Sequence, residues 1–117
     1  MTELIACLST GKGTWMPVVK LINCQEWDKV FLVATDFARE KFKGSKPVEF
    51  VVIDPNRDLK QLVPDIKSQL DGKIRGTEIA LNLNSGTGKE HMAVLSAVLK
   101  LGVGIRLVNF DNTIEEI

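Results

Sequence analysis

Short apolar runs alternate with amphipathic stretches along the first half of the chain. The continuous runs Leu4–Leu8 and Val30–Ala34 are typical of strands that are buried on both faces of a parallel sheet. Between them, the stretch Trp15–Ile22 carries apolar side chains at helical spacing. After the second run, Thr35-Asp36 can cap a short helix that should end before Gly44.

The alternation continues in the second half of the chain. The run Val48–Ile53 predicts a third strand, and the apolar stripe over Leu59–Leu70 predicts an amphipathic helix. Pro64 interrupts this stripe, so we expect either a kink there or a loose turn followed by a helix that begins near Pro64. The run Gly104–Phe110 predicts the last strand, and we expect the acidic tail, residues 111–117, to be irregular.

The chain is organised around Ala80–Leu99, which reads as a strand, a turn of small residues and a long apolar helix. Thr87 and Glu90 have the spacing of a capping box, so the helix should begin at about Gly88. We expect Gly102 to end this helix. Free N–H groups and the helix dipole both face such a turn, which makes it either an anion site or a well-capped connection without a ligand.

The alternation of five strands with four helices predicts a single domain over residues 1–117. We expect an α/β fold, a three-layer Rossmann-like sandwich around a mainly parallel five-stranded sheet. The apolar runs of strands one, two and four contain no charge, whereas strands three and five contain Glu49 and Arg106. Charged strands suit the edges of a sheet, which favours the strand order 3-2-1-4-5. The chain then reverses direction between strands one and four.

Ligands of such sheets bind outside the carboxyl ends of the strands, at the point where the strand order reverses. Two loops border this point, Ser9–Thr14 and Asn84–Lys89, and both are rich in Gly, Ser, Thr and Lys. Lys12 and Lys89 would offset the charge of a bound anion. The predicted ligand-binding residues are Ser9, Thr10, Gly11, Lys12, Asn82, Asn84, Ser85, Gly86, Thr87, Gly88 and Lys89.

Two polar side chains near the second loop have more than one interpretation. Asn82 lies at the end of a central strand, where an unpaired amide would cost about 1–3 kcal/mol. Either a ligand or the neighbouring loop backbone must therefore supply its partners. His91 lies in the first turn of the long helix, where a histidine is more often structural or exposed to solvent than functional.

Composition narrows the choice of partners and cofactors. The 15 basic and 15 acidic side chains cancel, which argues against binding to duplex nucleic acid or to an acidic membrane. Cys7 and Cys24 are not at metal-like spacing and the chain has one histidine, so we expect neither a metal nor another cofactor. The N-terminus lacks the pattern of a signal peptide and no apolar run is long enough for a membrane span, so we expect a cytoplasmic protein.

Two common nucleotide-binding motifs fail at particular residues. A P-loop at Gly86–Lys89 needs a glycine at position 83 and a Ser or Thr after the lysine, but the chain has Leu83 and Glu90 there. The loop Gly11–Gly13 lacks the third glycine of a dinucleotide-binding fingerprint.

Two stretches resemble the CRISPR-associated Rossmann-fold (CARF) family. Leu81–Thr87, which leads through Met92 into an apolar Ala/Leu helix, is similar to the signature turn of that family. Ile5–Gly11 is similar to its first strand and Ser/Thr-Gly loop. The resemblance implies a CARF-like homodimer of an antiviral defence system, which binds a cyclic oligoadenylate or another nucleotide in a crevice at the dimer interface.

Some stand-alone members of this family also cleave the cyclic ligand without a metal and are called ring nucleases. In them a Ser or Thr of the first loop and a Lys of the fourth-strand turn matter most, and Ser9, Thr10 and Lys89 match by motif position. The resemblance therefore makes Ser9 and Lys89 the candidate catalytic residues. Asn84 stands where the family usually has a hydroxyl, and Gly88 displaces Lys89, so ligand binding has more support than cleavage.

Two other functional classes stay open. The helix Met92–Leu99 is apolar almost all round, which fits a non-catalytic interaction module or a subunit of a larger assembly. An enzyme that acts on a different phosphorylated small molecule has less support, because no nucleophile–base pair or carboxylate dyad stands at a recognisable spacing.

Overall fold

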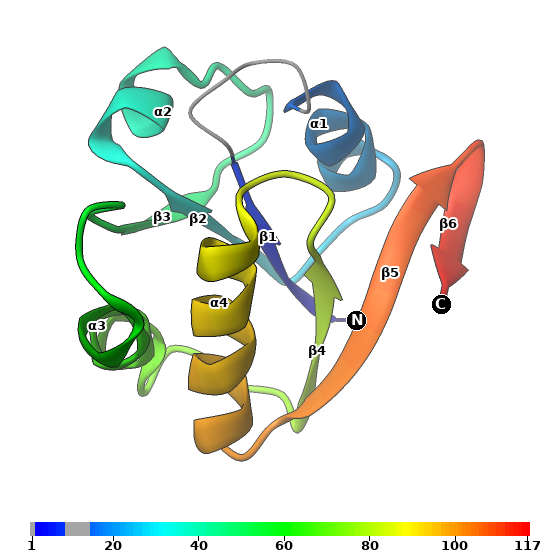
Figure 1. Ribbon diagram of the computed structural model, residues 1–117. Coiled ribbons are helices and arrows are strands. Elements are labelled where there is room, and N and C mark those ends of the chain that lie inside the picture. Colours follow the sequence, from blue (N-terminus) through cyan, green and yellow to red (C-terminus); the bar gives the residue numbers. More distant parts are fainter. Residues whose placement is uncertain (1, 9–14) are drawn as a thin grey trace.

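The computed structural model describes residues 2–8 and 15–117 of the chain (Figure 1). In chain order, its elements are β1 (Glu3–Cys7), α1 (Trp15–Asn23), β2 (Lys29–Ala34), α2 (Asp36–Lys41), β3 (Glu49–Val52), α3 (Leu59–Leu70), β4 (Glu78–Asn82), α4 (Gly88–Lys100), β5 (Gly104–Asp111) and β6 (Thr113–Glu116). Thr35 caps α2, within the pair predicted to cap it, and the predicted start of α4 at Gly88, after a cap at Thr87, is confirmed.

The strands form one sheet in the order β3-β2-β1-β4-β5-β6. All neighbours from β3 to β5 are parallel, and β6 pairs antiparallel with β5. The predicted α/β class and the order 3-2-1-4-5 are therefore confirmed. The reversal of strand order falls between β1 and β4, where Ala6 lies opposite Asn82 in the register.

The sixth strand corrects two predictions, because the expected count of five is one short and the tail is not irregular. β5 and β6 are joined at Asn112, which has a positive φ of 64° that asparagine tolerates better than most residues. β6 also removes β5 from the edge of the sheet. Arg106 bonds Glu116 of β6 and lies 3.6 Å from Glu78 of β4, so its charge marks an exposed face and not an edge strand.

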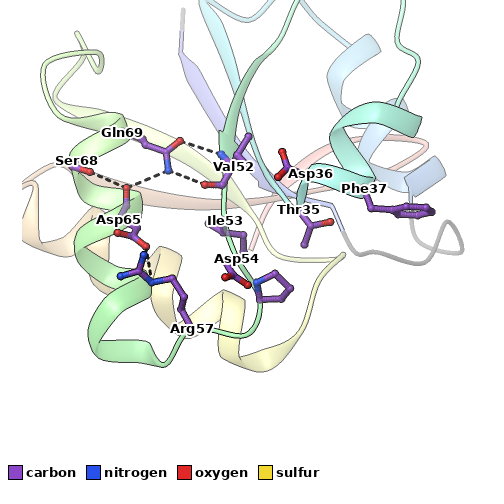
Figure 2. Close-up of a pocket in the computed structure, with 11 residues that line it drawn as sticks. Thr35, Asp36, Phe37, Val52, Ile53, Asp54, Arg57, Asp65, Ser68 and Gln69 are labelled. Atoms are coloured by element: carbon purple, nitrogen blue, oxygen red, sulfur yellow. Dashed lines mark hydrogen bonds and ion pairs between the residues drawn. The ribbon is translucent and has the colours of Figure 1, made fainter.

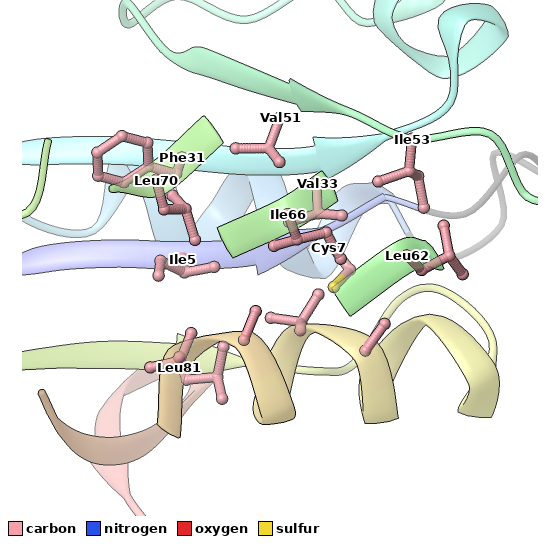
Figure 3. Packing of buried hydrophobic residues seen from close by; sticks show 14 of the residues in the cluster. Ile5, Cys7, Phe31, Val33, Val51, Ile53, Leu62, Ile66, Leu70 and Leu81 are labelled. Carbon is pink, nitrogen blue, oxygen red and sulfur yellow. The ribbon is translucent and has the colours of Figure 1, made fainter. Parts of the chain in front are cut away.

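The parallel strands β1 to β5 contribute side chains to two apolar clusters, one on each face of the sheet. Ile5 and Cys7 of β1 pack with residues of α3 and α4, whereas Leu4 and Ala6 pack with residues of α1 and α2. Figure 3 shows the first cluster, in which the side chains of the central strands meet Leu62, Ile66 and Leu70 of α3. The alternation follows from the two-residue period of a strand.

One of the two predictions for Pro64, a helix that begins near this residue, is wrong. The helix begins at Leu59, after a capping box between Asp58 and Gln61, and continues through Pro64 instead of beginning there. Pro64 is exposed, so water can solvate the carbonyl that loses its intrahelical N–H partner. Packing of the apolar stripe against the sheet holds the helix together across the proline.

A buried carboxylate holds the other end of the sheet, away from the predicted site. Glu3 begins β1 and is only 5% exposed. Its two oxygens accept hydrogen bonds from the backbone N–H groups of Arg75 (3.0 and 3.1 Å) and Gly76 (2.8 Å), in the loop before β4. The sequence interpretation missed this charge, because it treated the central strand as beginning at Leu4.

Candidate functional site

The predicted site lies where the carboxyl ends of β1 and β4 meet, beside the N-terminus of α4. The first of its two loops, with Ser9, Thr10, Gly11 and Lys12, falls outside the described residues. The second loop connects β4 to α4 and is described completely. Its geometry can therefore be built up residue by residue.

The asparagines of this loop bond within the fold. The Asn82 side chain is buried, and its Nδ2 donates to the carbonyl of Val108 on β5 at 2.8 Å. Its Oδ1 accepts from the backbone N–H of Asn84 at 3.2 Å. The exposed Asn84 donates from Nδ2 to Oδ1 of Asn109, also on β5, at 2.7 Å. Backbone groups therefore supply the partners of Asn82, as one of its two interpretations predicted. This buried side chain holds the turn in shape from beneath.

Gly86 allows the tight approach of the turn to β1 and α4. Its φ is +105°, a conformation that residues with a side chain rarely adopt. A Cβ atom there would lie 2.9 Å from Oε1 of Glu90, 3.2 Å from Nε2 of His91 and 3.3 Å from Cβ of Cys7. At Gly88, in contrast, a Cβ atom would meet nothing within 4 Å. Of these two glycines, the structure requires the first.

The predicted capping box is confirmed and closes the turn. Thr87 accepts from the N–H of Glu90 at 3.2 Å, and Glu90 accepts from the N–H of Thr87 at 3.0 Å. His91 adds a third closure, since its Nε2 donates to the carbonyl of Ser85 at 2.7 Å, which assigns the proton to that nitrogen. His91 is thus structural, as one interpretation of its position predicted.

Two N–H groups of the first turn of α4 remain available. Those of Gly88 and Lys89 have no hydrogen-bond partner within residues 2–8 and 15–117. Both residues are exposed, and the helix dipole adds positive potential at this end. Lys89 extends across the surface, where its Nζ donates to the carbonyl of Pro55 in the loop after β3 at 3.2 Å. One ammonium hydrogen is used in this way, and the other two have no partner among the described residues.

The ionisable groups beneath the turn are not suited to nucleophilic or general-base chemistry. Burial, together with the nearby carboxylate of Glu90, raises the pKa of the Cys7 thiol to about 12. At neutral pH this thiol is therefore protonated and a poor nucleophile. Glu90 and His91 are engaged in closing the turn. Among the described residues, the turn thus offers positive potential and hydrogen-bond donors instead of a nucleophile–base pair.

The sequence interpretation missed a groove of about 630 Å³ at the carboxyl ends of β2 and β3 (Figure 2). Asp36 and Asp54 line it, together with Arg57, which lies 3.3 Å from Asp65. Among the described residues that line the groove, the three carboxylates of Asp36, Asp54 and Asp65 outnumber the one cation, Arg57, which is already paired with Asp65. The negative charge of the groove therefore disfavours an anionic ligand. No motif in the sequence points to it, because its walls come from segments that follow different strands.

Gln69 closes one side of this groove by bonding the edge strand β3. Its Nε2 donates to the carbonyl of Val52 at 2.9 Å, and its Oε1 accepts from the N–H of the same residue at 3.1 Å. A side-chain amide thus takes the place of a neighbouring strand at this position. This pairing reduces the free edge of β3 that could otherwise recruit a further strand.

The described residues bear on two of the predicted partners, a metal ion and a membrane. No group of three or more His, Cys, Asp or Glu residues in residues 2–8 and 15–117 is placed to hold a metal ion. In the same part of the chain, no helix combines the length and apolar character that crossing a bilayer requires. The cytoplasmic location stays a prediction.

The chain matches no protein-family model and no curated protein sequence.

Proposed function

We propose that this chain binds an anionic nucleotide at the carboxyl ends of β1 and β4, and that its ligand is of the cyclic oligoadenylate class implied by the CARF resemblance. The observation that carries the proposal is the pair of N–H groups of Gly88 and Lys89, which have no partner among the described residues and are held by a closed turn at the reversal of strand order. In open α/β sheets, this is where ligands bind. Helix N-termini there favour phosphate groups.

The described residues of the turn divide into those that would contact the ligand and those that hold the turn in shape. The N–H groups of Gly88 and Lys89 donate to phosphate oxygens, and the free hydrogens of the Lys89 ammonium add charge-assisted hydrogen bonds. Asn82 and Ser85 are buried and act by keeping the turn in shape. Contacts from Ser9, Thr10, Gly11 and Lys12 stay predictions of the sequence.

Ring cleavage is the subordinate part of the proposal. With Cys7 protonated and with Glu90 and His91 engaged in closing the turn, these three residues supply no free general base. Cleavage would then depend on positioning the ribose 2′-hydroxyl for in-line attack on the adjacent phosphate. The 2′ oxygen would bond to phosphorus as the bond from phosphorus to the 5′ oxygen breaks, which gives a 2′,3′-cyclic phosphate, and the 2′-hydroxyl proton would pass through water to the departing 5′ oxygen. Lys89 would stabilise the developing negative charge, and Ser9 is its predicted catalytic partner.

The experiment compares Lys89→Ala with Lys100→Ala, which removes a lysine at the other end of the same helix. Lys89→Ala should weaken binding of cyclic tetra-adenylate, cyclic hexa-adenylate or ATP by about tenfold to hundredfold, the effect of one charge-assisted hydrogen bond of about 1.5–3 kcal/mol. Its melting temperature should barely change, because loss of the bond to Pro55 is offset by removal of a cation from the positive end of the helix.

Calorimetric titration and thermal unfolding of both variants give the measurement, and Lys100→Ala should bind as the unchanged chain does. A chain that binds none of the three nucleotides at millimolar concentration contradicts the proposal. So does a Lys89→Ala variant that melts much lower yet keeps every affinity, since the lysine would then be structural.

We also propose that two copies pair through the outer face of α4, which would bring two crevices together. Met92, Leu95 and Leu99 follow the spacing of one helical face and are 62%, 38% and 60% exposed. These three residues form the outer stripe of α4. A protein partner other than a second copy, as expected for an interaction module, would use the same stripe.

Charged substitutions on the outer stripe should dissociate the dimer. The double variant Leu95→Glu/Leu99→Glu is expected to elute and scatter light as a monomer at concentrations where the unchanged chain is a dimer, because carboxylates cannot be buried in an apolar interface without large cost. Met16→Glu, on the exposed face of α1, is the control and should remain a dimer. Monomeric behaviour of the unchanged chain at high micromolar concentration contradicts the pairing.

A further inference from the structure

A second groove, of about 470 Å³, lies between α3 and α4. Leu59, Val63 and Pro64 of α3 supply its apolar walls. Lys60 and Lys67 of the same helix and Lys100 of α4 border it. We call it the α3–α4 groove. Its lining shares no residue with the proposed nucleotide site, and its Lys100 lies at the opposite end of α4 from Gly88.

The three lysines of the α3–α4 groove are not neutralised within the fold. None of them forms an ion pair with another described residue, whereas Lys29, Lys46 and Lys73 are each paired with a glutamate. The nearest acidic residue on the same helix, Asp65, lies 3.3 Å from Arg57 and lines the other groove. The chain carries no net charge, so this basic border is a local feature instead of part of an overall field.

We propose that the α3–α4 groove docks an acidic amphipathic segment of a partner protein. Apolar side chains of that segment would pack on Leu59, Val63 and Pro64, and its carboxylates would pair with the three lysines. Helices commonly bind in this way, with one apolar face laid into a groove between two helices. Opposite charges around the rim would speed association and select against basic partners.

The shape and lining of the groove favour a peptide over other acidic partners. A membrane surface is met by protruding apolar residues, whereas this apolar surface is recessed between two helices. Single-stranded nucleic acid is usually held by aromatic side chains on which bases stack, and none of the described residues that line the groove is aromatic. A concave apolar floor with a cationic rim complements carboxylate-bearing apolar side chains.

The test uses a fluorescein-labelled helical peptide of about four turns, with leucines on one face and glutamates on the other. A scrambled peptide of the same composition is its control. Fluorescence anisotropy should show that the amphipathic peptide binds at least about tenfold more tightly than the scrambled one, with weaker binding at about 0.5 M salt. The charge reversal Lys60→Glu/Lys67→Glu should reduce this affinity by at least about tenfold.

Two further variants keep the test decisive. Lys100→Glu changes the opposite wall of the groove and should weaken binding in the same direction, even if the α3 variant folds poorly by circular dichroism. Lys20→Glu/Lys43→Glu makes the same change of net charge elsewhere and should bind as the unchanged chain does. Equal binding of the two peptides, equal loss in the control variant, or binding only to vesicles that contain phosphatidylserine would each overturn the proposal. Nucleotide affinity should be the same in all these variants, so the two proposals can fail separately.

Discussion

Gly86→Ala is expected to lower the free energy of unfolding by about 2–4 kcal/mol. The φ of +105° is strained for any residue with a side chain, at about 1–3 kcal/mol. The added methyl carbon would also lie 2.9 Å from Oε1 of Glu90 and 3.2 Å from Nε2 of His91. Those two side chains close the turn, and loss of a helix cap alone costs about 0.5–2 kcal/mol. Urea unfolding measures the change.

Gly88→Ala is the matched control, two residues further along the same turn. Its φ is not positive and its Cβ atom would meet nothing within 4 Å, so the variant should be as stable as the unchanged chain or up to about 1 kcal/mol more stable. If the turn positions the N–H groups for a phosphate, Gly86→Ala should also lose nucleotide affinity. Equal stability of the two variants would show that the turn can relax without cost.

Glu3→Ala is expected to destabilise the protein by about 3 kcal/mol, and Glu3→Gln by about 2 kcal/mol. The carboxylate is the acceptor for the N–H groups of Arg75 and Gly76, and hydrogen bonds to a charged group contribute about 1.5–3 kcal/mol each. Alanine leaves both donors without this acceptor in a partly buried place. Glutamine can keep Oε1, which accepts from both N–H groups, but it turns an NH₂ group toward the N–H of Arg75, which also bonds Oε2.

Glu78→Gln is the control for the buried carboxylate, since Glu78 begins the neighbouring strand at the same end of the sheet. Its side chain is 53% exposed, and its pair with Arg106 is 3.6 Å long, so the loss should stay below about 1 kcal/mol. Urea unfolding of Glu3→Ala, Glu3→Gln and Glu78→Gln measures whether the free energy of unfolding falls more at position 3 than at position 78. Similar losses at both positions would mean that water satisfies the N–H groups of the 75–76 loop.

The strand order was predicted correctly, but one of its two supports was wrong. Glu49 does mark the edge strand β3, where it pairs with Lys29 at 2.8 Å and bonds Lys73. Arg106 does not mark an edge, because β6 covers β5. A charge within a strand shows that one side of that strand reaches solvent. It does not distinguish an exposed face from a free edge.

At the candidate site, local geometry was predictable and contacts between distant segments were not. The Thr87–Glu90 capping box depends on residues three apart, so its spacing alone reveals it. The bond from Lys89 to Pro55 joins residues 34 apart, and the Asn82 bond to Val108 joins residues 26 apart. No local pattern specifies such pairs, since they depend on which strands are neighbours.

The fold class, the caps of α2 and α4 and the central order of strands could be predicted from the amino-acid sequence, because apolar periodicity and helix caps act over a few residues. Which polar groups meet, and where the surface is hollow, depends on the three-dimensional arrangement of the elements. Glu3 is 72 residues from the N–H group it accepts from, and the α3–α4 groove exists only because two helices pack side by side on one face of the sheet. Both depend on the relative placement of whole elements, which packing of the core sets.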